Sequence, residues 1–112
     1  MLVNKDNALE ILKSDVTDFL YPLKMGDEVN IGKYKKLIFT LNDITRLYKT
    51  EDLIPKKLLS EIYLTAEGIS NESPHIKNFD LGSMAEEIME KYYMLLSGKS
   101  VDDPKPEVGR II

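Results

Sequence analysis

Apolar residues recur at steps of three and four positions along most of the chain, which is the period of an amphipathic helix with one buried face. Four stretches show this pattern, over residues 4–20, 33–49, 55–68 and 83–97. The run KLIFTL at residues 36–41 would by itself also suit a strand, but the longer helical period favours a helix. The positions expected to face a common core are Ala8, Leu9, Leu12, Val16, Phe19 and Leu20; Tyr34, Ile38, Leu41, Ile44 or Thr45, and Tyr48, with Leu37 at the edge; Leu58, Leu59, Ile62, Tyr63 and Ala66; and Met84, Ala85, Ile88, Tyr92, Leu95 and Leu96.

Residues that favour helix ends bound the first and third stretches. Asn4 suits the N-cap of the first helix, and the Tyr21-Pro22 pair is expected to end it, because proline disfavours helical geometry in the residue before it. Pro55 suits the first turn of the third helix, where its missing N–H costs nothing. The third helix is expected to run to about Gly68, with a polar loop after it.

The fourth stretch carries the clearest start and stop signals. Ser83 and Glu86 have the spacing of a capping box, in which each side chain accepts a hydrogen bond from a free backbone N–H of the first turn. Gly98 suits the position just after a helix end, where the backbone often turns left-handed.

Four helices that each carry one apolar stripe must bury those stripes against one another. The predicted fold class is therefore all-α: a compact bundle of about four helices over residues 1–98. Residues 99–112 contain two prolines and are predicted to form an extended tail of the same domain, packed back on the bundle.

The sequence ends with Ile111 and Ile112, which follow that proline-containing stretch. Burying one isoleucine side chain stabilises a fold by about 1.5–3 kcal/mol. Burial of two isoleucines could therefore offset the conformational entropy that is lost when a few residues of the tail become ordered. We expect the two isoleucines to dock in a groove of the bundle. A frayed terminus and a contact with a partner are the alternatives.

Composition excludes several kinds of chemistry. The 112 residues include no cysteine, so disulfides, zinc thiolate sites and cysteine nucleophiles are excluded. No apolar run has the length of a signal peptide or a membrane span, so we expect a cytoplasmic protein that makes no membrane contact. His75 is the single histidine, whereas a di-iron bundle uses a Glu-x-x-His pair on each of two helices and a triad needs a nucleophile aligned with its histidine, so neither site is expected. No cofactor and no enzymatic activity are predicted.

The net charge of −4 is unevenly distributed. Residues 1–50 carry eight basic and seven acidic side chains, whereas residues 51–112 carry seven basic and twelve acidic ones, a net of −5. An acidic half suits a basic partner, or serves solubility alone. Lys33, Lys35 and Lys36 surround Tyr34 and could touch phosphates, but a nucleic-acid-binding domain normally has a clear basic excess. Nucleic acid is therefore not the expected partner.

The candidate binding surface lies on the fourth stretch and just after it. Adjacent helical positions point about 100° apart, so Tyr93 should face outward if Tyr92 faces the core. An exposed tyrosine among acidic side chains gives a basic partner an aromatic anchor and speeds its encounter. The predicted partner-binding residues are Glu86, Glu87, Glu90, Tyr93, Asp102 and Asp103.

In size, helical pattern, lack of cysteine and acidic bias, the chain resembles the small single-domain immunity proteins of bacteria. That resemblance implies a non-catalytic protein that neutralises a cognate toxin, often a nuclease, by covering its basic surface; it rests on no shared motif and assigns no residue. The alternative is a small helical regulatory or adaptor protein, with weak nucleic-acid contact through Lys33, Lys35 and Lys36. An enzyme is the third hypothesis, and self-association through leftover apolar surface is compatible with all three.

Overall fold

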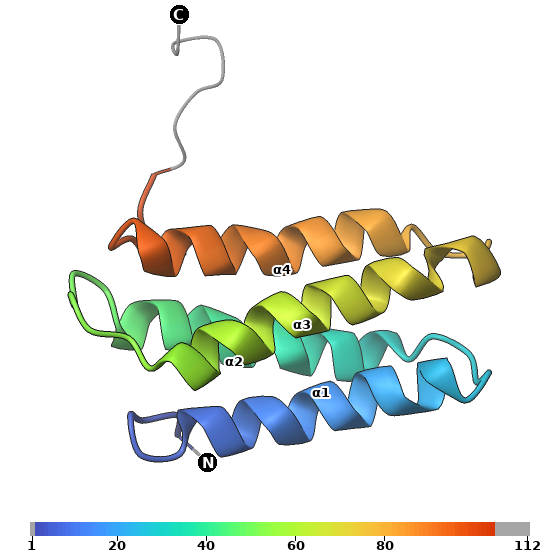
Figure 1. Ribbon diagram of the computed structural model, residues 1–112, viewed down its shortest axis with the longest axis horizontal. Helices are drawn as coiled ribbons and strands as arrows, with labels where there is room; N and C mark the ends of the chain where they lie inside the picture. Colours follow the sequence, from blue (N-terminus) through green and yellow to red (C-terminus); the bar gives the residue numbers. More distant parts are fainter. Residues whose placement is uncertain (1, 105–112) are drawn as a thin grey trace, which may run out of the picture.

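The computed structural model describes residues 2–104 and contains, within that range, four α-helices, one short 3₁₀ helix and no strand. The helices are α1 (Ala8–Lys24), α2 (Ile31–Leu47), α3 (Lys56–Glu72) and α4 (Leu81–Leu96), and the 3₁₀ helix η1 (Ser73–His75) follows α3. The predicted all-α bundle is confirmed (Figure 1). None of the described helices is long and apolar enough to cross a membrane.

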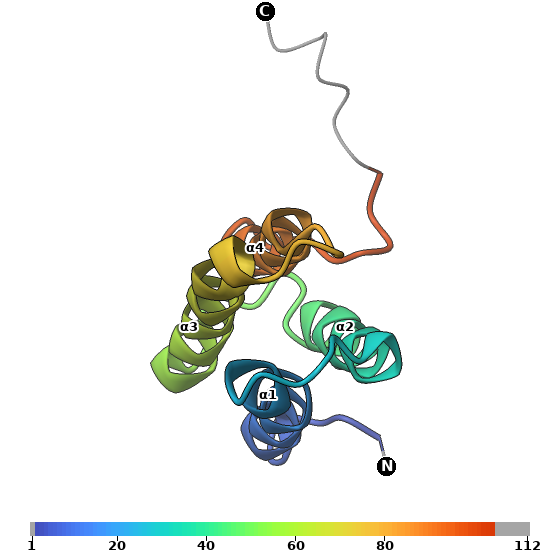
Figure 2. The same ribbon diagram turned by 90° about the vertical axis from the view of Figure 1, so that its right-hand side faces the viewer.

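Successive helices run in opposite directions, but they are not all neighbours. α1 packs against α2 and α3, and α4 packs against α3 and α2 (Figure 2). α1 and α4 therefore face each other across one diagonal of the bundle, and α2 and α3 across the other. The connection from α2 to α3 crosses the end of the bundle. Along the outside of the bundle, a seam runs between the two helices of each packed pair.

The core is formed by the predicted stripes, with a few differences. Leu37, expected at the edge, is fully buried, and Leu23, Ile69 and Leu81 join the core. Tyr63 and Leu96 were expected inside, but they are 44% and 57% exposed. Tyr63 lies at the rim because Leu58, Ile62, Thr65 and Ile69 set the buried face of α3, and Leu96 is the last residue of α4, one position past the buried Leu95.

Both ends of α1 differ from the prediction: the helix begins at Ala8 with Asn7 in its N-cap position, and Asn4, the predicted N-cap, lies in the turn before it. The side chain of Asn4 accepts hydrogen bonds from the backbone N–H groups of Asp6 and Asn7, and Asn7 reciprocates by accepting from the N–H of Asn4. The prediction that Tyr21-Pro22 ends the helix is wrong, because α1 continues to Lys24. Near a helix end the proline forfeits only one backbone hydrogen bond, and its own carbonyl accepts from Asp27 N at 3.0 Å.

The predicted end of α3 at Gly68 is also wrong. Gly68 is buried inside the helix, which continues to Glu72 through the first residues of the predicted polar loop. A Cβ atom at this position would lie 2.8 Å from Cδ2 of Leu20 on α1. Gly68 therefore marks a close approach of α3 to α1 and not a helix end.

The two remaining helices begin slightly earlier than predicted. α2 starts at Ile31 because Asn30 caps it, accepting from Lys33 N at 3.1 Å. The capping box predicted at Ser83 and Glu86 is wrong: Asp80 is the N-cap of α4, and it accepts from both the backbone N–H and the hydroxyl of Ser83. An ionised carboxylate is the better acceptor at the positive end of the helix dipole.

The end of α4 is as predicted. Gly98 has a φ of 72°, and the backbone N–H groups of Gly98 and Lys99 donate to the carbonyls of Leu95 and Met94. This pair of hydrogen bonds is the Schellman motif that satisfies the last carbonyls of a helix.

The first residues after Gly98 are not extended as predicted. Residues 100–103 form a tight turn, which we call the C-terminal turn, in which Asp103 N donates to Ser100 O. Ser100 is buried, and Val101 N donates to the hydroxyl of Thr45 on α2. The turn thus packs on the end of α2, whereas the predicted docking of Ile111 and Ile112 concerns residues beyond the described part of the chain.

Candidate functional site

An open groove of about 760 Å³ runs along the outer seam between α3 and α4, and we call it the acidic groove. Three acidic side chains line it: Glu67 from α3, and Glu86 and Glu90 from α4. No lysine or arginine of the described chain is among its lining residues, which are Tyr63, Ala66, Glu67, Ser70, Gly82, Ala85, Glu86, Met89, Glu90 and Tyr93. The groove therefore presents carboxylates without an opposing cation in its wall.

The groove follows from helical spacing and from small residues at its floor. Tyr63, Glu67 and Ser70 follow one another at steps of four and three on α3, and such steps keep side chains on one face. Between the two rows, Ala66 and Ala85 are buried and carry only a methyl group. Short side chains at the floor and long ones at the rims leave a hollow along the seam.

Two half-exposed tyrosine rings stand at one end of the acidic groove. Tyr63 is 44% exposed and Tyr93 is 60% exposed. The partly buried ring of Tyr92 lies between them, with its centroid 6.1 Å from that of Tyr63 and 5.6 Å from that of Tyr93 in an edge-on arrangement. Such tilted contacts are the favoured geometry of aromatic pairs. They help to hold both exposed rings in place.

Two of the three carboxylates of the groove are not neutralised by an ion pair with a described residue. Within residues 2–104 neither Glu67 nor Glu86 has a salt-bridge partner, and Glu90 lies 3.9 Å from the ammonium of its neighbour Lys91. Like charges gathered along one concave surface raise the local concentration of oppositely charged ligands.

Glu86, Glu90 and Tyr93, which the sequence grouped as partner-binding residues, line this one groove. Glu87 does not, because it points toward α2, where its carboxylate accepts a hydrogen bond from the hydroxyl of Tyr34. Burial of the Tyr34 hydroxyl raises its pKa, and the hydrogen bond to Glu87 raises it further. Glu87 thus lies on the α2–α4 seam, away from the other predicted carboxylates.

Asp102 and Asp103 face cations of α2. Asp102 accepts from Nε of Arg46 at 2.9 Å, and Asp103 accepts from Nζ of Lys49 at 2.7 Å and from Ser100 N at 2.8 Å. The hydrogen bond to Asp102 chiefly raises the pKa of Arg46, and the hydrogen bond from Lys49 chiefly lowers the pKa of Asp103. The two carboxylates hold the C-terminal turn on the bundle, and their charges are largely opposed by α2.

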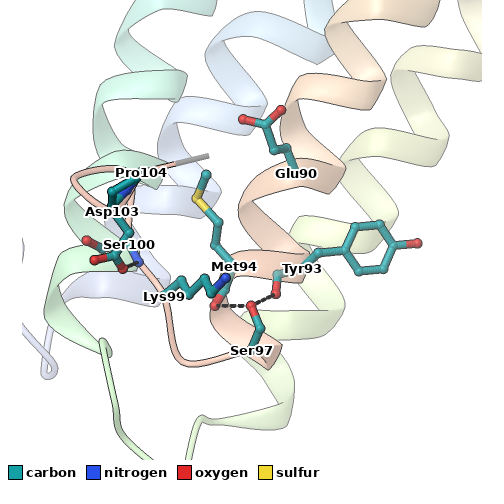
Figure 3. A pocket seen from close by; sticks show the side chains of 8 residues that line it. All are labelled: Glu90, Tyr93, Met94, Ser97, Lys99, Ser100, Asp103 and Pro104. Carbon is teal, nitrogen blue, oxygen red and sulfur yellow. Dashed lines mark hydrogen bonds between the residues drawn. The ribbon is translucent and has the colours of Figure 1, made fainter. Parts of the chain in front are cut away.

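A second, smaller hollow of about 330 Å³ lies on the other side of Glu90 and Tyr93 (Figure 3). Met94, Ser97, Lys99, Ser100, Asp103 and Pro104 complete its lining. The ring of Tyr93 points away from Met94 and the C-terminal turn, so Tyr93 stands on the ridge between the two hollows (Figure 3). Lys99 brings a cation into this hollow, which makes its charge mixed, unlike that of the acidic groove.

Sequence reasoning missed Glu67 and misplaced Tyr63. The available signal was their four-residue spacing on α3, which puts both on one helical face. This spacing alone could not assign the two residues to the site, because only the packing of α3 on α4 turns that face toward Glu86 and Tyr93.

The remaining candidates from the sequence are a metal site, His75 and the lysines around Tyr34. No group of three or more histidine, aspartate or glutamate side chains there has a geometry that could hold a metal ion. His75 is exposed in η1. Lys36, one of the three lysines around Tyr34, donates to the buried carboxylate of Asp15 at 2.7 Å, which leaves Lys33 and Lys35 as the basic residues of that surface.

Comparisons of the chain with protein-family models, with curated proteins and with solved structures found no match in any of the three.

Proposed function

We propose that this protein is a non-catalytic binding module that receives a basic segment of a partner protein in its acidic groove. One observation carries the proposal: three carboxylates and two half-exposed tyrosine rings line a single open groove whose described wall has no cation. Lysine or arginine side chains are the natural complement of such a surface.

Each part of the groove has a role in this proposal. The carboxylates of Glu67, Glu86 and Glu90 pair with the charged ends of lysine or arginine side chains, and the ring faces of Tyr63 and Tyr93 attract the same cations. Tyrosine is also among the residues that most often dominate binding energy. The carboxylates thus steer encounter, and the rings anchor the bound segment.

In its most specific form, the proposal is that of an immunity-type protein acting in the bacterial cytoplasm. A nuclease toxin needs a basic surface to hold phosphates. A small acidic protein that covers this surface would block the substrate and neutralise the toxin. The acidic second half of the chain, the lack of cysteine and the small helical fold support this form.

The alternative, an adaptor with nucleic-acid contact, has less support. It relies on Lys33, Lys35 and Lys36, and the ammonium of Lys36 is paired with Asp15. Two exposed lysines are few for phosphate binding, which normally uses a broad basic patch.

The test compares wild type with the double variant Glu86→Lys/Glu90→Lys. A tagged protein first isolates its partner from native lysate, and the affinity for the purified partner is then measured by surface plasmon resonance at low and high salt. We expect the double variant to bind more than about tenfold more weakly at low salt, mainly through a slower association rate.

The matched control is Asp27→Lys/Glu28→Lys, which changes the charge equally in the exposed loop between α1 and α2. It should retain affinity within about threefold, because distant exposed charges are screened by salt. Equal losses in the two double variants would show that only net charge matters, and an unchanged affinity of Glu86→Lys/Glu90→Lys would refute the assignment of the groove.

A further inference from the structure

The outer face of α2 carries an apolar surface that no described segment covers. Phe39 is 70% exposed at the centre of this face. Beside it, between α2 and α4, lies a groove of about 470 Å³ whose walls are mostly apolar and include Tyr34, Ile38 and Met84. This groove is separate from the acidic groove, because α2 and α3 lie on different sides of α4 (Figure 2). An exposed apolar side chain next to an apolar groove is typical of an interaction site.

Charges flank Phe39 symmetrically. Lys35 lies four residues before it and Asp43 four residues after it, and both are exposed. Four residues are about one helical turn, or about 6 Å along the axis, so all three side chains project from one face. Asp43 already accepts from Nη1 of Arg46 at 3.0 Å, yet 51% of its side chain remains exposed. The positions one turn before and one turn after Phe39 thus carry opposite charges, and Arg46 follows beside Asp43.

This order is complementary to itself. If two copies of α2 cross in antiparallel fashion about a two-fold axis at Phe39, Lys35 of each copy meets Asp43 of the other. A parallel arrangement would instead set like charges against each other. Closed two-fold dimers are the commonest homo-oligomers, and they require this kind of self-complementary surface.

We propose that the outer face of α2 is a homodimer interface, occupied by the same face of a second copy of this chain. Phe39 of each copy packs over the apolar wall of the other copy's α2–α4 groove, and two Lys35–Asp43 ion pairs flank the contact. The acidic groove stays open in both copies, so the dimer would present two binding sites.

The interface is centred on a single helix face, so it is smaller than the about 1,600 Å² of a standard stable complex. We therefore expect a reversible dimer with a dissociation constant of about 10–500 μM, weaker at high salt because the flanking ion pairs are exposed.

Analytical ultracentrifugation of the untagged full chain from about 10 μM to about 1 mM at low salt tests the proposal over the range expected for a contact of this size. The wild type should dimerise with concentration, and Phe39→Asp should remain monomeric throughout. Leu64→Asp is the matched control, because it changes an apolar side chain of similar exposure (56%) on α3. It should dimerise like the wild type, and circular dichroism should show that each variant is folded.

Charge reversal gives the sharper test. Lys35→Asp or Asp43→Lys alone should weaken the dimer by about tenfold, because each change replaces two attractive contacts with two repulsive ones. The combined variant Lys35→Asp/Asp43→Lys should recover most of the wild-type affinity. A wild type that stays monomeric at about 1 mM, a dimer unaffected by Phe39→Asp, or a combined variant without recovery would overturn the proposal. If the wild type is monomeric and Phe39→Asp weakens partner binding, the face belongs to the partner and not to a second copy.

Discussion

At the scale of single residues, Thr50 is the one described non-glycine residue with a positive φ, at 63°. Left-handed geometry costs an ordinary residue about 1–2 kcal/mol, and a β-branched side chain is poorly suited to it. The backbone here turns so that Thr50 N can donate to Gly98 O at 3.3 Å, which joins the α2–α3 connection to the end of α4. The left-handed conformation of Thr50 thus accompanies a contact between segments that are distant in sequence.

The variant Thr50→Asn should therefore be more stable than the wild type. Asparagine tolerates left-handed geometry, so we expect the free energy of unfolding to rise by about 1 kcal/mol in urea titrations. Thr50→Val is the control: it keeps the β-branch, so it should bring no gain, and an equal gain from valine would exclude backbone strain as the cause.

Two aspartates make the stability sensitive to acid. Hydrogen bonds from the backbone N–H and hydroxyl of Ser83 lower the pKa of Asp80, and the hydrogen bond from Lys49 chiefly lowers that of Asp103. A carboxyl whose folded pKa lies below its unfolded value stabilises the fold fully above the unfolded value, near pH 4, and loses that contribution as the pH falls through the folded value.

Thermal melts of wild type and Asp103→Asn between pH 2 and pH 7 measure this effect. The wild type should have the higher melting temperature at neutral pH. The difference should shrink as the pH falls below about 4, because protonation removes the negative charge of Asp103, which the variant lacks at every pH. A difference that stays constant down to pH 2 would contradict the assigned role of Asp103.

At the scale of helices, one glycine sets the approach of α3 to α1. The backbone of Gly68 leaves room for the side chain of Leu20, and the ammonium of Lys24 on α1 donates to the Gly68 carbonyl at 3.4 Å. A larger residue at position 68 must displace Leu20 or push the two helices apart. Overpacked cores lose about 1–3 kcal/mol in this way.

Gly68→Val should accordingly destabilise the protein by about 1–3 kcal/mol, measured by urea denaturation. The double variant Gly68→Val/Leu20→Ala should be more stable than the sum of the two single changes predicts, because removing the leucine side chain makes room for valine. Strict additivity would show that the cost comes from β-branching in the helix and not from the contact with α1.

Helix ends show most clearly how far sequence patterns reach. Gly98 ended α4 as predicted, because a left-handed helix end depends on residues within one turn. The ends at Pro22 and Gly68 were predicted wrongly. Burial of Leu23 extends α1 past the proline, and the approach of Leu20 explains why a glycine stands inside α3. Both effects arise from neighbouring helices.

At the scale of the whole molecule, the diagonal order of the helices decides which surfaces exist. Because α4 packs between α2 and α3, it contributes one wall to the acidic groove and another to the groove beside Phe39 (Figure 2). The six predicted site residues are separated accordingly. Glu86, Glu90 and Tyr93 stay together, Glu87 turns to Tyr34, and Asp102 and Asp103 bind cations of α2.

The sequence by itself determined the four amphipathic helices, most of their buried positions, the outward direction of Tyr93 and the acidic bias of the second half. These depend on helical periodicity and composition, which act locally along the chain. Only the tertiary structure decided that Glu67 and Tyr63 join Glu86 and Tyr93 in one groove, and that Asp102 and Asp103 are paired with Arg46 and Lys49. Those outcomes depend on which helices become neighbours, and that is set by the packing of all four apolar stripes at once.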